Sequence, residues 1–98
     1  RTIVAAAAFR ALSDMSAFDS RIDAGRLDSL LARCAADPSA APAARVMAVQ
    51  LCGERRIASS RMALDAMLSD PDTPEILRRS ARHSMSLFGK REKTKAVP

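Results

Sequence analysis

The chain has 98 residues, of which 48% are apolar and 3% aromatic, and a formal net charge of +5. This length fits one small domain, whose core must be built mainly from aliphatic side chains. Few β-branched residues and no run of alternating polarity argue against a sheet, and no apolar stretch approaches the roughly 18 residues of a membrane span. We therefore expect an all-α protein without a membrane-spanning segment.

Five segments show the apolar periodicity of amphipathic helices. The second has a clear solvent face, whereas the third is apolar almost all round, which is typical of a helix covered from more than one direction. In chain order, the predicted helices span residues 2–14, 24–36, 41–53, 56–69 and 74–88.

Two Asp-Pro pairs separate the predicted helices, at Asp37-Pro38 and Asp70-Pro71. Proline cannot continue the hydrogen-bond ladder of a helix and disfavours α geometry in the residue before it. Each pair is therefore predicted to end a helix, and Gly53 with Glu54-Arg55 is predicted to make the break between the third and fourth helices.

Two segments lack a helical period. The connection at residues 16–23 is long for a helix pair, and its Phe18 and Ile22 are expected to point inward. Residues 89–98 are polar and basic, so we expect a flexible tail after a single domain at residues 1–88.

The sequence contains an internal repeat in which an Asp-Pro pair is followed by Arg-x-x-Ala. An offset of 33 superimposes four residues on four others: Asp37 on Asp70, Pro38 on Pro71, Arg45 on Arg78 and Ala48 on Ala81. This unit resembles the HEAT repeat, particularly the short bacterial form related to the phycocyanobilin-lyase HEAT-like repeats, over roughly residues 24–88. The resemblance implies short antiparallel helix pairs stacked as an α-solenoid that acts in protein binding.

The repeated residues also suggest physical roles. Ala48 and Ala81 are expected where helices of adjacent repeats cross closely, because a larger side chain would separate them. The arginines of the repeat lie near the start of their helices, where Asp37 and Asp70 are expected to accept their hydrogen bonds. Such an exposed link contributes about 0–1 kcal/mol.

Counted in this way, the chain holds two and a half helix pairs, whereas stacked arrays need about three units. Three arrangements would cover an open end: continuation in a longer HEAT-like array, modified first and fifth helices acting as caps, or a partner chain. The basic outer side of the fifth helix favours a cap at that end.

The excess of positive charge is confined to residues 74–98, which carry seven basic and two acidic side chains. A solvated helix face explains this cluster most simply. Among partners, an acidic protein is favoured over nucleic acid, because no aromatic residue is interleaved for base stacking, and over a membrane surface. The candidate partner-binding residues are Arg78, Arg79, Arg82, His83, Lys90 and Arg91.

Catalytic and metal-binding patterns are absent from the sequence. His83 is the only histidine and lacks a nucleophile or a paired carboxylate nearby, and no glycine-rich phosphate loop is present. Cys34 and Cys52 are expected to be buried as small apolar residues, with a disulfide between neighbouring helices left open. We expect no enzyme activity, no metal, no cofactor and a cytoplasmic location.

The sequence therefore predicts a non-catalytic protein-binding or scaffold module of HEAT-like helices. The alternative is nucleic-acid binding through the basic fifth helix and the tail.

Overall fold

The structure is a computed structural model that describes the backbone of residues 2–96 and the side chains of residues 6–89. Within this range the chain is helical and contains no strand, which confirms the predicted all-α class. No described helix is both long and apolar enough to cross a membrane. The helices are α1 (Thr2–Ser16), α2 (Ala24–Ala36), α3 (Pro42–Glu54), α4 (Arg61–Ser69) and α5 (Glu75–Ala96), with a 3₁₀-helix, η1 (Ala58–Ser60), directly before α4.

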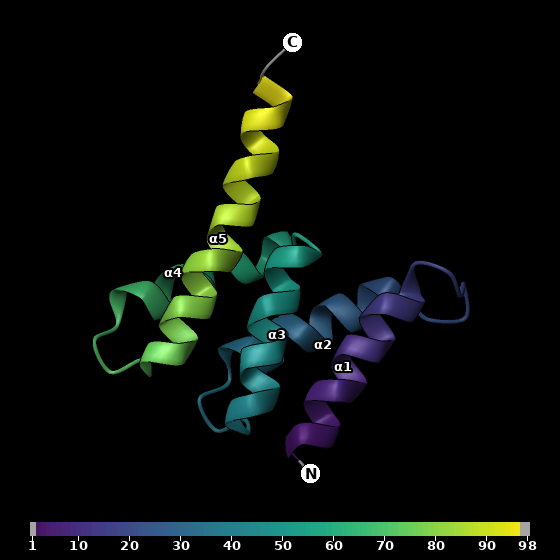
Figure 1. The fold of residues 1–98 in the computed structure, drawn as a ribbon, viewed down its shortest axis with the longest axis horizontal. Helices are drawn as coiled ribbons and strands as arrows, with labels where there is room; N and C mark the ends of the chain where they lie inside the picture. Colours follow the sequence, from purple (N-terminus) through teal and green to yellow (C-terminus); the bar gives the residue numbers. More distant parts are fainter. Residues whose placement is uncertain (1, 97–98) are drawn as a thin grey trace.

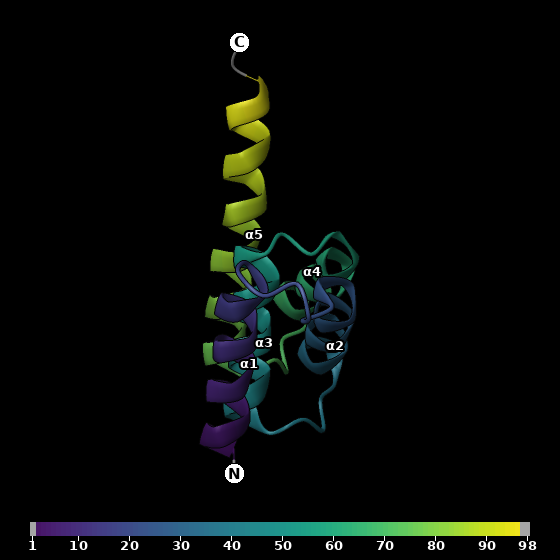
Figure 2. The same ribbon diagram turned by 90° about the vertical axis from the view of Figure 1, so that its right-hand side faces the viewer.

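The five helices are arranged in two layers (Figures 1 and 2). α1, α3 and α5 lie side by side in one layer, and α2 and α4 form the other. α3 is the central helix and packs against α1, α2 and α5, as its nearly continuous apolar surface predicted. Hydrophobic burial between the layers and along α3 therefore provides the single core.

The 33-residue repeat is visible in the structure. α2 and α4 end 33 residues apart, at Ala36 and Ser69, and α3 and α5 begin 33 residues apart, at Pro42 and Glu75. Burial follows the same step: the side chains at each of the matched pairs Leu31 and Leu64, and Ala48 and Ala81, are fully buried. The repeating unit is thus a helix pair, of which α2–α3 is one copy and α4–α5 the next. The remaining helix, α1, is the half pair.

α3 and α5 approach each other most closely at Gly53. A Cβ atom at this position would lie 2.5 Å from Ser84 Cβ and 2.6 Å from Ser84 Cα. The hydroxyl of Ser84 donates a 2.7 Å hydrogen bond to the carbonyl oxygen of Val49, so even the polar group at the crossing is satisfied. The predicted break at Gly53 and Glu54-Arg55 lies slightly too early, because α3 continues through Glu54 and its cap is Arg55. Gly53 itself lies inside α3 and is small to admit α5.

The chain leaves α3 through a Schellman motif centred on Arg56, whose φ of 52° is in the left-handed region. The Ile57 N–H donates to the Cys52 carbonyl at 2.9 Å, and the Arg56 N–H donates to the Gly53 carbonyl at 3.1 Å. These two bonds satisfy carbonyl groups that have no partner within the helix. Glycine is the usual residue at this position because it lacks the Cβ atom that makes left-handed geometry costly.

Replacing Arg56 with glycine is expected to raise the free energy of unfolding by about 0.5–1 kcal/mol, because relief of the left-handed strain exceeds the added chain entropy. Urea unfolding followed by circular dichroism measures the change. Arg33→Gly is the matched control, since Arg33 is also exposed but lies within α2, where glycine should destabilise by about 1 kcal/mol. A loss of stability in Arg56→Gly would show that the left-handed geometry carries no strain.

The repeated arginines bind backbone carbonyls at the turns between layers. Arg45 Nε donates to the Ala35 carbonyl at 2.9 Å, and Arg78 Nη2 donates to the carbonyls of Asp70 and Pro71 at 3.0 and 3.1 Å. Carbonyl groups at a helix C-terminus lack intrahelical partners, which makes them good acceptors for a guanidinium from the next helix. The prediction that the aspartate side chains accept these hydrogen bonds was therefore wrong.

The two carboxylates instead organise their own turns. Asp37 accepts hydrogen bonds from the Ser39 N–H at 2.9 Å and the Ser39 hydroxyl at 2.7 Å, which hold the pKa of its carboxyl below the usual range. Asp70 accepts from the Asp72 N–H at 2.9 Å. Each Asp-Pro turn thus has an aspartate that fixes its backbone and an arginine that binds the end of the preceding helix.

The predicted end of the fifth helix was wrong, because α5 continues through Ala96. The segment after Gly89 contains lysine, arginine, glutamate and alanine, which favour helix, and no proline before Pro98. Apolar periodicity could not reveal this extension, since the segment has almost no apolar residues. Residues 97–98 of the predicted tail lie outside the described residues.

Candidate functional site

The six predicted binding residues are all in α5 but differ in availability. The side chains of Arg79, Arg82 and His83 are exposed, whereas Arg78 is half-buried and bound to the turn before α5. The remaining two, Lys90 and Arg91, continue the helix, and their side chains lie outside the described part of the chain. The structure therefore leaves three described side chains free to form a basic surface.

One residue of the basic surface, Arg82, and the nearby Ser86 match positions at which α3 packs against its neighbour. The 33-residue step matches Arg82 with Val49 of α3, and Ser86 with Gly53. Val49 and Gly53 are buried, whereas Arg82 and Ser86 are exposed. At these two positions α5 thus exposes polar side chains where α3 has buried residues.

An ion pair at the edge of the basic surface joins α1 to the end of α3. Arg10 binds Glu54 through two hydrogen bonds of 2.8 and 2.7 Å. This hydrogen bonding, with a smaller electrostatic contribution from His83, holds the pKa of Glu54 below its ordinary value. Glu54, Arg79 and His83 line the same shallow depression, so the ion pair of Arg10 with Glu54 borders the basic surface.

Glu54→Gln is expected to lower the free energy of unfolding by about 0.5 kcal/mol at neutral pH, a small value because both side chains are partly exposed. The pKa of Glu54 is lower in the folded state than in the unfolded state, so its ionised form stabilises the fold at any pH above the unfolded-state pKa. This stabilisation is lost as the pH falls through the folded-state pKa. The difference between wild type and variant should therefore vanish between about pH 5 and pH 3. Urea unfolding at several pH values tests this, with Asp65→Asn as an exposed control on α4.

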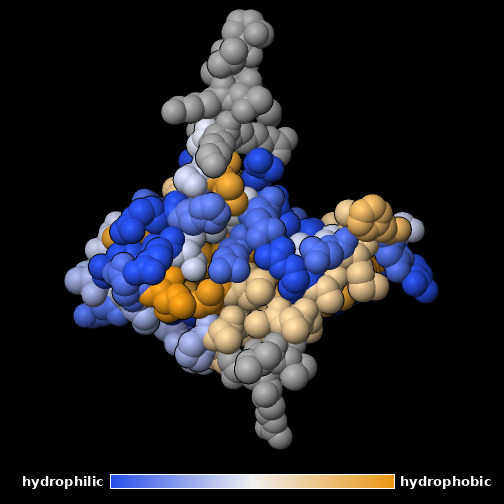
Figure 3. Space-filling model, in the orientation of Figure 1, coloured by the Kyte–Doolittle hydropathy of each residue, from blue (hydrophilic) through white to orange (hydrophobic). Residues whose placement is uncertain are grey.

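The surface at the α1 end is apolar, in contrast to the α5 end. Leu12, Met15 and Phe18 are 38%, 49% and 92% exposed, and Leu30 of α2 is 48% exposed. Figure 3 shows hydrophobic colouring over α1 and mostly hydrophilic colouring over α5, apart from an apolar patch near the start of α5, where Ile76 is 61% exposed. The prediction that Phe18 points inward was wrong, whereas Ile22 is half-buried. Contiguous apolar exposure of this kind marks interaction surfaces.

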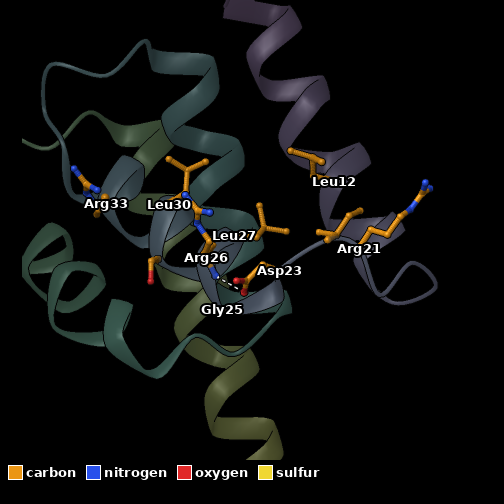
Figure 4. A pocket seen from close by; sticks show the side chains of 10 residues that line it. Leu12, Arg21, Asp23, Gly25, Arg26, Leu27, Leu30 and Arg33 are labelled. Carbon is orange, nitrogen blue, oxygen red and sulfur yellow. Dashed lines mark hydrogen bonds between the residues drawn. The ribbon is translucent and has the colours of Figure 1, made fainter.

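A groove between α1 and α2 is part of this apolar end, and we call it the α1–α2 groove (Figure 4). Its volume is about 750 Å³. The apolar part of the lining comes from both helices and the connection between them: Leu12, Ile22, Leu27 and Leu30. The arginines of the lining are Arg21, Arg26 and Arg33. The groove is open and combines an apolar floor with a rim of three arginines and one carboxylate, Asp23, which caps α2 by accepting a hydrogen bond from the Arg26 N–H.

Arg55 fixes the position of α1 relative to α2. Its Nε donates to Asp28 of α2 at 2.6 Å, and its Nη1 donates to the hydroxyls of Ser16 and Ser13 of α1 at 2.8 and 3.2 Å. A guanidinium presents its donors in a rigid, planar arrangement, so this contact sets a fixed spacing between the helices. The groove is therefore preformed, although α1 and α2 pack directly over only a short stretch.

The sequence did not reveal the groove. Leu12 and Leu30 belong to the apolar stripes of their helices, which by themselves indicate a shared face and not whether that face is covered. Both stripes are wide, and none of the described helices covers the side of α1 that lies away from α3. The available signal was the count of two and a half helix pairs, which implied an uncovered layer without showing its place.

The two cysteines are free thiols. Cys52 is fully buried, and burial raises its pKa to about 11, so the thiol stays protonated at neutral pH and packs as a small apolar side chain. Cys34 is half-buried, and burial raises its pKa as well. Among the described side chains, no group of three or more His, Cys, Asp or Glu residues is arranged to hold a metal ion.

Comparison of the chain with protein-family models, curated proteins and solved structures found no match. The resemblance to HEAT repeats thus depends on the repeated residues alone, and it stays a prediction.

Proposed function

We propose that the chain is a non-catalytic protein-binding module built from HEAT-like helix pairs. The observation that carries the proposal is the difference between its two ends. The α5 end has arginine and serine at its packing positions, whereas the α1 end exposes Leu12, Met15, Phe18 and Leu30. An apolar end beside a polar end is the arrangement expected of a stack that binds a partner through one side.

The layer arrangement supports this proposal. α3 is packed by α2, and α5 is packed by α4, so each of these helices has a preceding helix in the other layer. α1 has no such neighbour among the described residues. A protein partner that covers the apolar surface of α1 would gain hydrophobic burial at a position that the stack itself leaves open.

A cytoplasmic location remains part of the proposal, and it is compatible with the two unbridged thiols of Cys34 and Cys52. The proposed role requires neither a metal nor a cofactor.

Affinity capture from a native cell extract tests the proposal. Wild-type protein should retain a specific partner, Leu30→Glu should lose it, and Met62→Glu should keep it. Met62 is the matched control because it is also an apolar residue, is 87% exposed and lies on α4, away from the α1 end. No retained protein, or equal retention by all three chains, would refute the proposed role of the α1 end.

Nucleic-acid binding through α5 is the second candidate function. It is supported by the continuous helix from Glu75 to Ala96, which extends beyond the body of the molecule in Figure 1 and carries exposed Arg79 and Arg82. The helix continues with four further basic residues, Lys90, Arg91, Lys93 and Lys95. This candidate predicts an affinity that falls steeply with salt.

A mobility-shift titration with duplex DNA and single-stranded RNA at 50 and 200 mM salt tests this candidate. Full-length protein is compared with a chain that stops at Gly89. Binding that disappears at high salt and on truncation would support it, and no binding at low salt would remove it.

A further inference from the structure

We propose that the α1–α2 groove binds an amphipathic helix with acidic flanks, presented by a partner protein. This inference deepens the proposed protein-binding function and depends on it, because it assigns the binding site and the chemistry of the partner.

The shape of the occupant follows from the repeat. α2 packs on α3, and α4 packs on α5, in each case as an antiparallel helix before a five-residue turn. The place that corresponds to α2 and α4 beside α1 is the α1–α2 groove, where a helix would contact α1 and the exposed side of α2 (Figure 4). A helix in the groove would therefore pack on α1 in the same way that α2 packs on α3 and α4 packs on α5.

The floor of the groove sets the apolar face of the occupant. Leu12 approaches from α1, and Leu27 and Leu30 from α2, so apolar side chains line both walls. Helix-in-groove recognition places apolar residues of the ligand at positions i, i+3, i+4 and i+7. Exposed Leu12 and Leu30 would become buried on binding. This burial is the main favourable contribution to the binding free energy.

Charge at the rim favours an acidic partner. Arg26 and Arg33 are exposed, lie on the same face of α2 as Leu30, and form no ion pair with any described side chain. The third arginine of the lining, Arg21, is already paired with Asp19 at 2.8 Å. Two unpaired guanidinium groups beside an apolar floor complement glutamate or aspartate on the flanks of a helix.

The same charges argue against a second copy of this chain as the occupant. The long exposed helix of the chain, α5, carries basic Arg79 and Arg82 on its outer surface. Docking α5 of one copy into the groove of another would bring like charges together at Arg26 and Arg33, which is unfavourable.

The test uses full-length protein labelled with ¹⁵N and two 16-residue model helices as probes. Both probes carry leucine at i, i+3, i+4 and i+7, and their flanks carry either glutamate or lysine. We expect amide shifts in α1 and α2, with the glutamate probe binding about five- to tenfold more tightly at low salt. Arg26→Glu combined with Arg33→Glu should reverse this preference, and Arg79→Glu combined with Arg82→Glu should leave it unchanged.

Leu30→Glu should abolish binding of both probes while circular dichroism and the unfolding midpoint show a folded chain, since Leu30 is half-exposed. Equal affinity for the two probes, shifts centred on α5, or no binding would overturn the proposal. Sedimentation that shows a dimer dissociated by Leu30→Glu would also overturn it, because a second copy would then fill the groove. If Leu30→Glu and the Arg26→Glu, Arg33→Glu double variant both still capture a partner, the groove assignment is overturned. The proposed protein-binding function would then stand.

Discussion

Replacing Gly53 with alanine is expected to destabilise the fold by about 2–3 kcal/mol, although alanine is the better helix former by about 1 kcal/mol. The new methyl group would meet Ser84 at 2.5–2.6 Å, and one of the atoms it meets is the backbone Cα of α5. A flexible side chain could turn away from such a contact, whereas a backbone atom moves only if the two helices separate. Separation would also strain the hydrogen bond from Ser84 to Val49.

Urea unfolding measures this effect, and Gly25→Ala is the matched control. A Cβ atom at Gly25 would meet only a side-chain oxygen of Asp23, at 3.4 Å, so the ordinary helix preference should stabilise this variant by about 0.5–1 kcal/mol. The two identical substitutions should thus have opposite signs. Stabilisation by Gly53→Ala would mean that α3 and α5 are farther apart than described.

Leu31→Ala is expected to lower the free energy of unfolding by about 3 kcal/mol, which is a large part of the stability of a domain of this size. Leu31 is fully buried at the centre of the core, on the face of α2 that packs toward α3 and η1. Truncation removes apolar burial and leaves a cavity that packed helices fill only in part. Thermal unfolding should show the loss as a midpoint lowered by about 4–8 °C per kcal/mol.

Leu30→Ala is the control for this prediction, because Leu30 is the neighbouring residue on the same helix and is half-exposed. Its loss should be below about 1 kcal/mol. Similar losses for the two variants would contradict the described orientation of α2, since a rotation of the helix by one residue would exchange their environments.

Most of the fold could be predicted from the sequence because its helices are short, amphipathic and separated by Asp-Pro turns. The periodic stripes located α1, α2 and α3 to within about two residues. The predicted start of the fourth helix at residue 56 was wrong, because the turn at Arg56 and the 3₁₀-helix η1 come first and α4 begins at Arg61. Residues whose role depends on a distant segment could not be interpreted in this way. Gly53 resembles part of a helix break in the sequence. Only the position of Ser84 explains why a glycine lies there, inside α3.

The candidate site was less predictable than the fold. The sequence located the basic residues of α5, of which Arg79, Arg82 and His83 are exposed, but it could not show that Arg78 binds the carbonyls of the preceding turn. It also could not show that Leu12 and Leu30 line a groove. A stripe shows which residues share a face, whereas exposure depends on whether another element covers that face.

The unlike ends of the stack also have a consequence for solubility. A protein forms open-ended fibres when a sticky patch on one copy fits a complementary patch elsewhere on the next copy. Here the apolar patch at α1 would meet arginine and serine at the opposite end of the molecule. Arg82 and Ser86 of α5 occupy the positions that correspond to Val49 and Gly53 of α3. The exposed leucines can therefore remain available to a partner without committing the protein to head-to-tail aggregation.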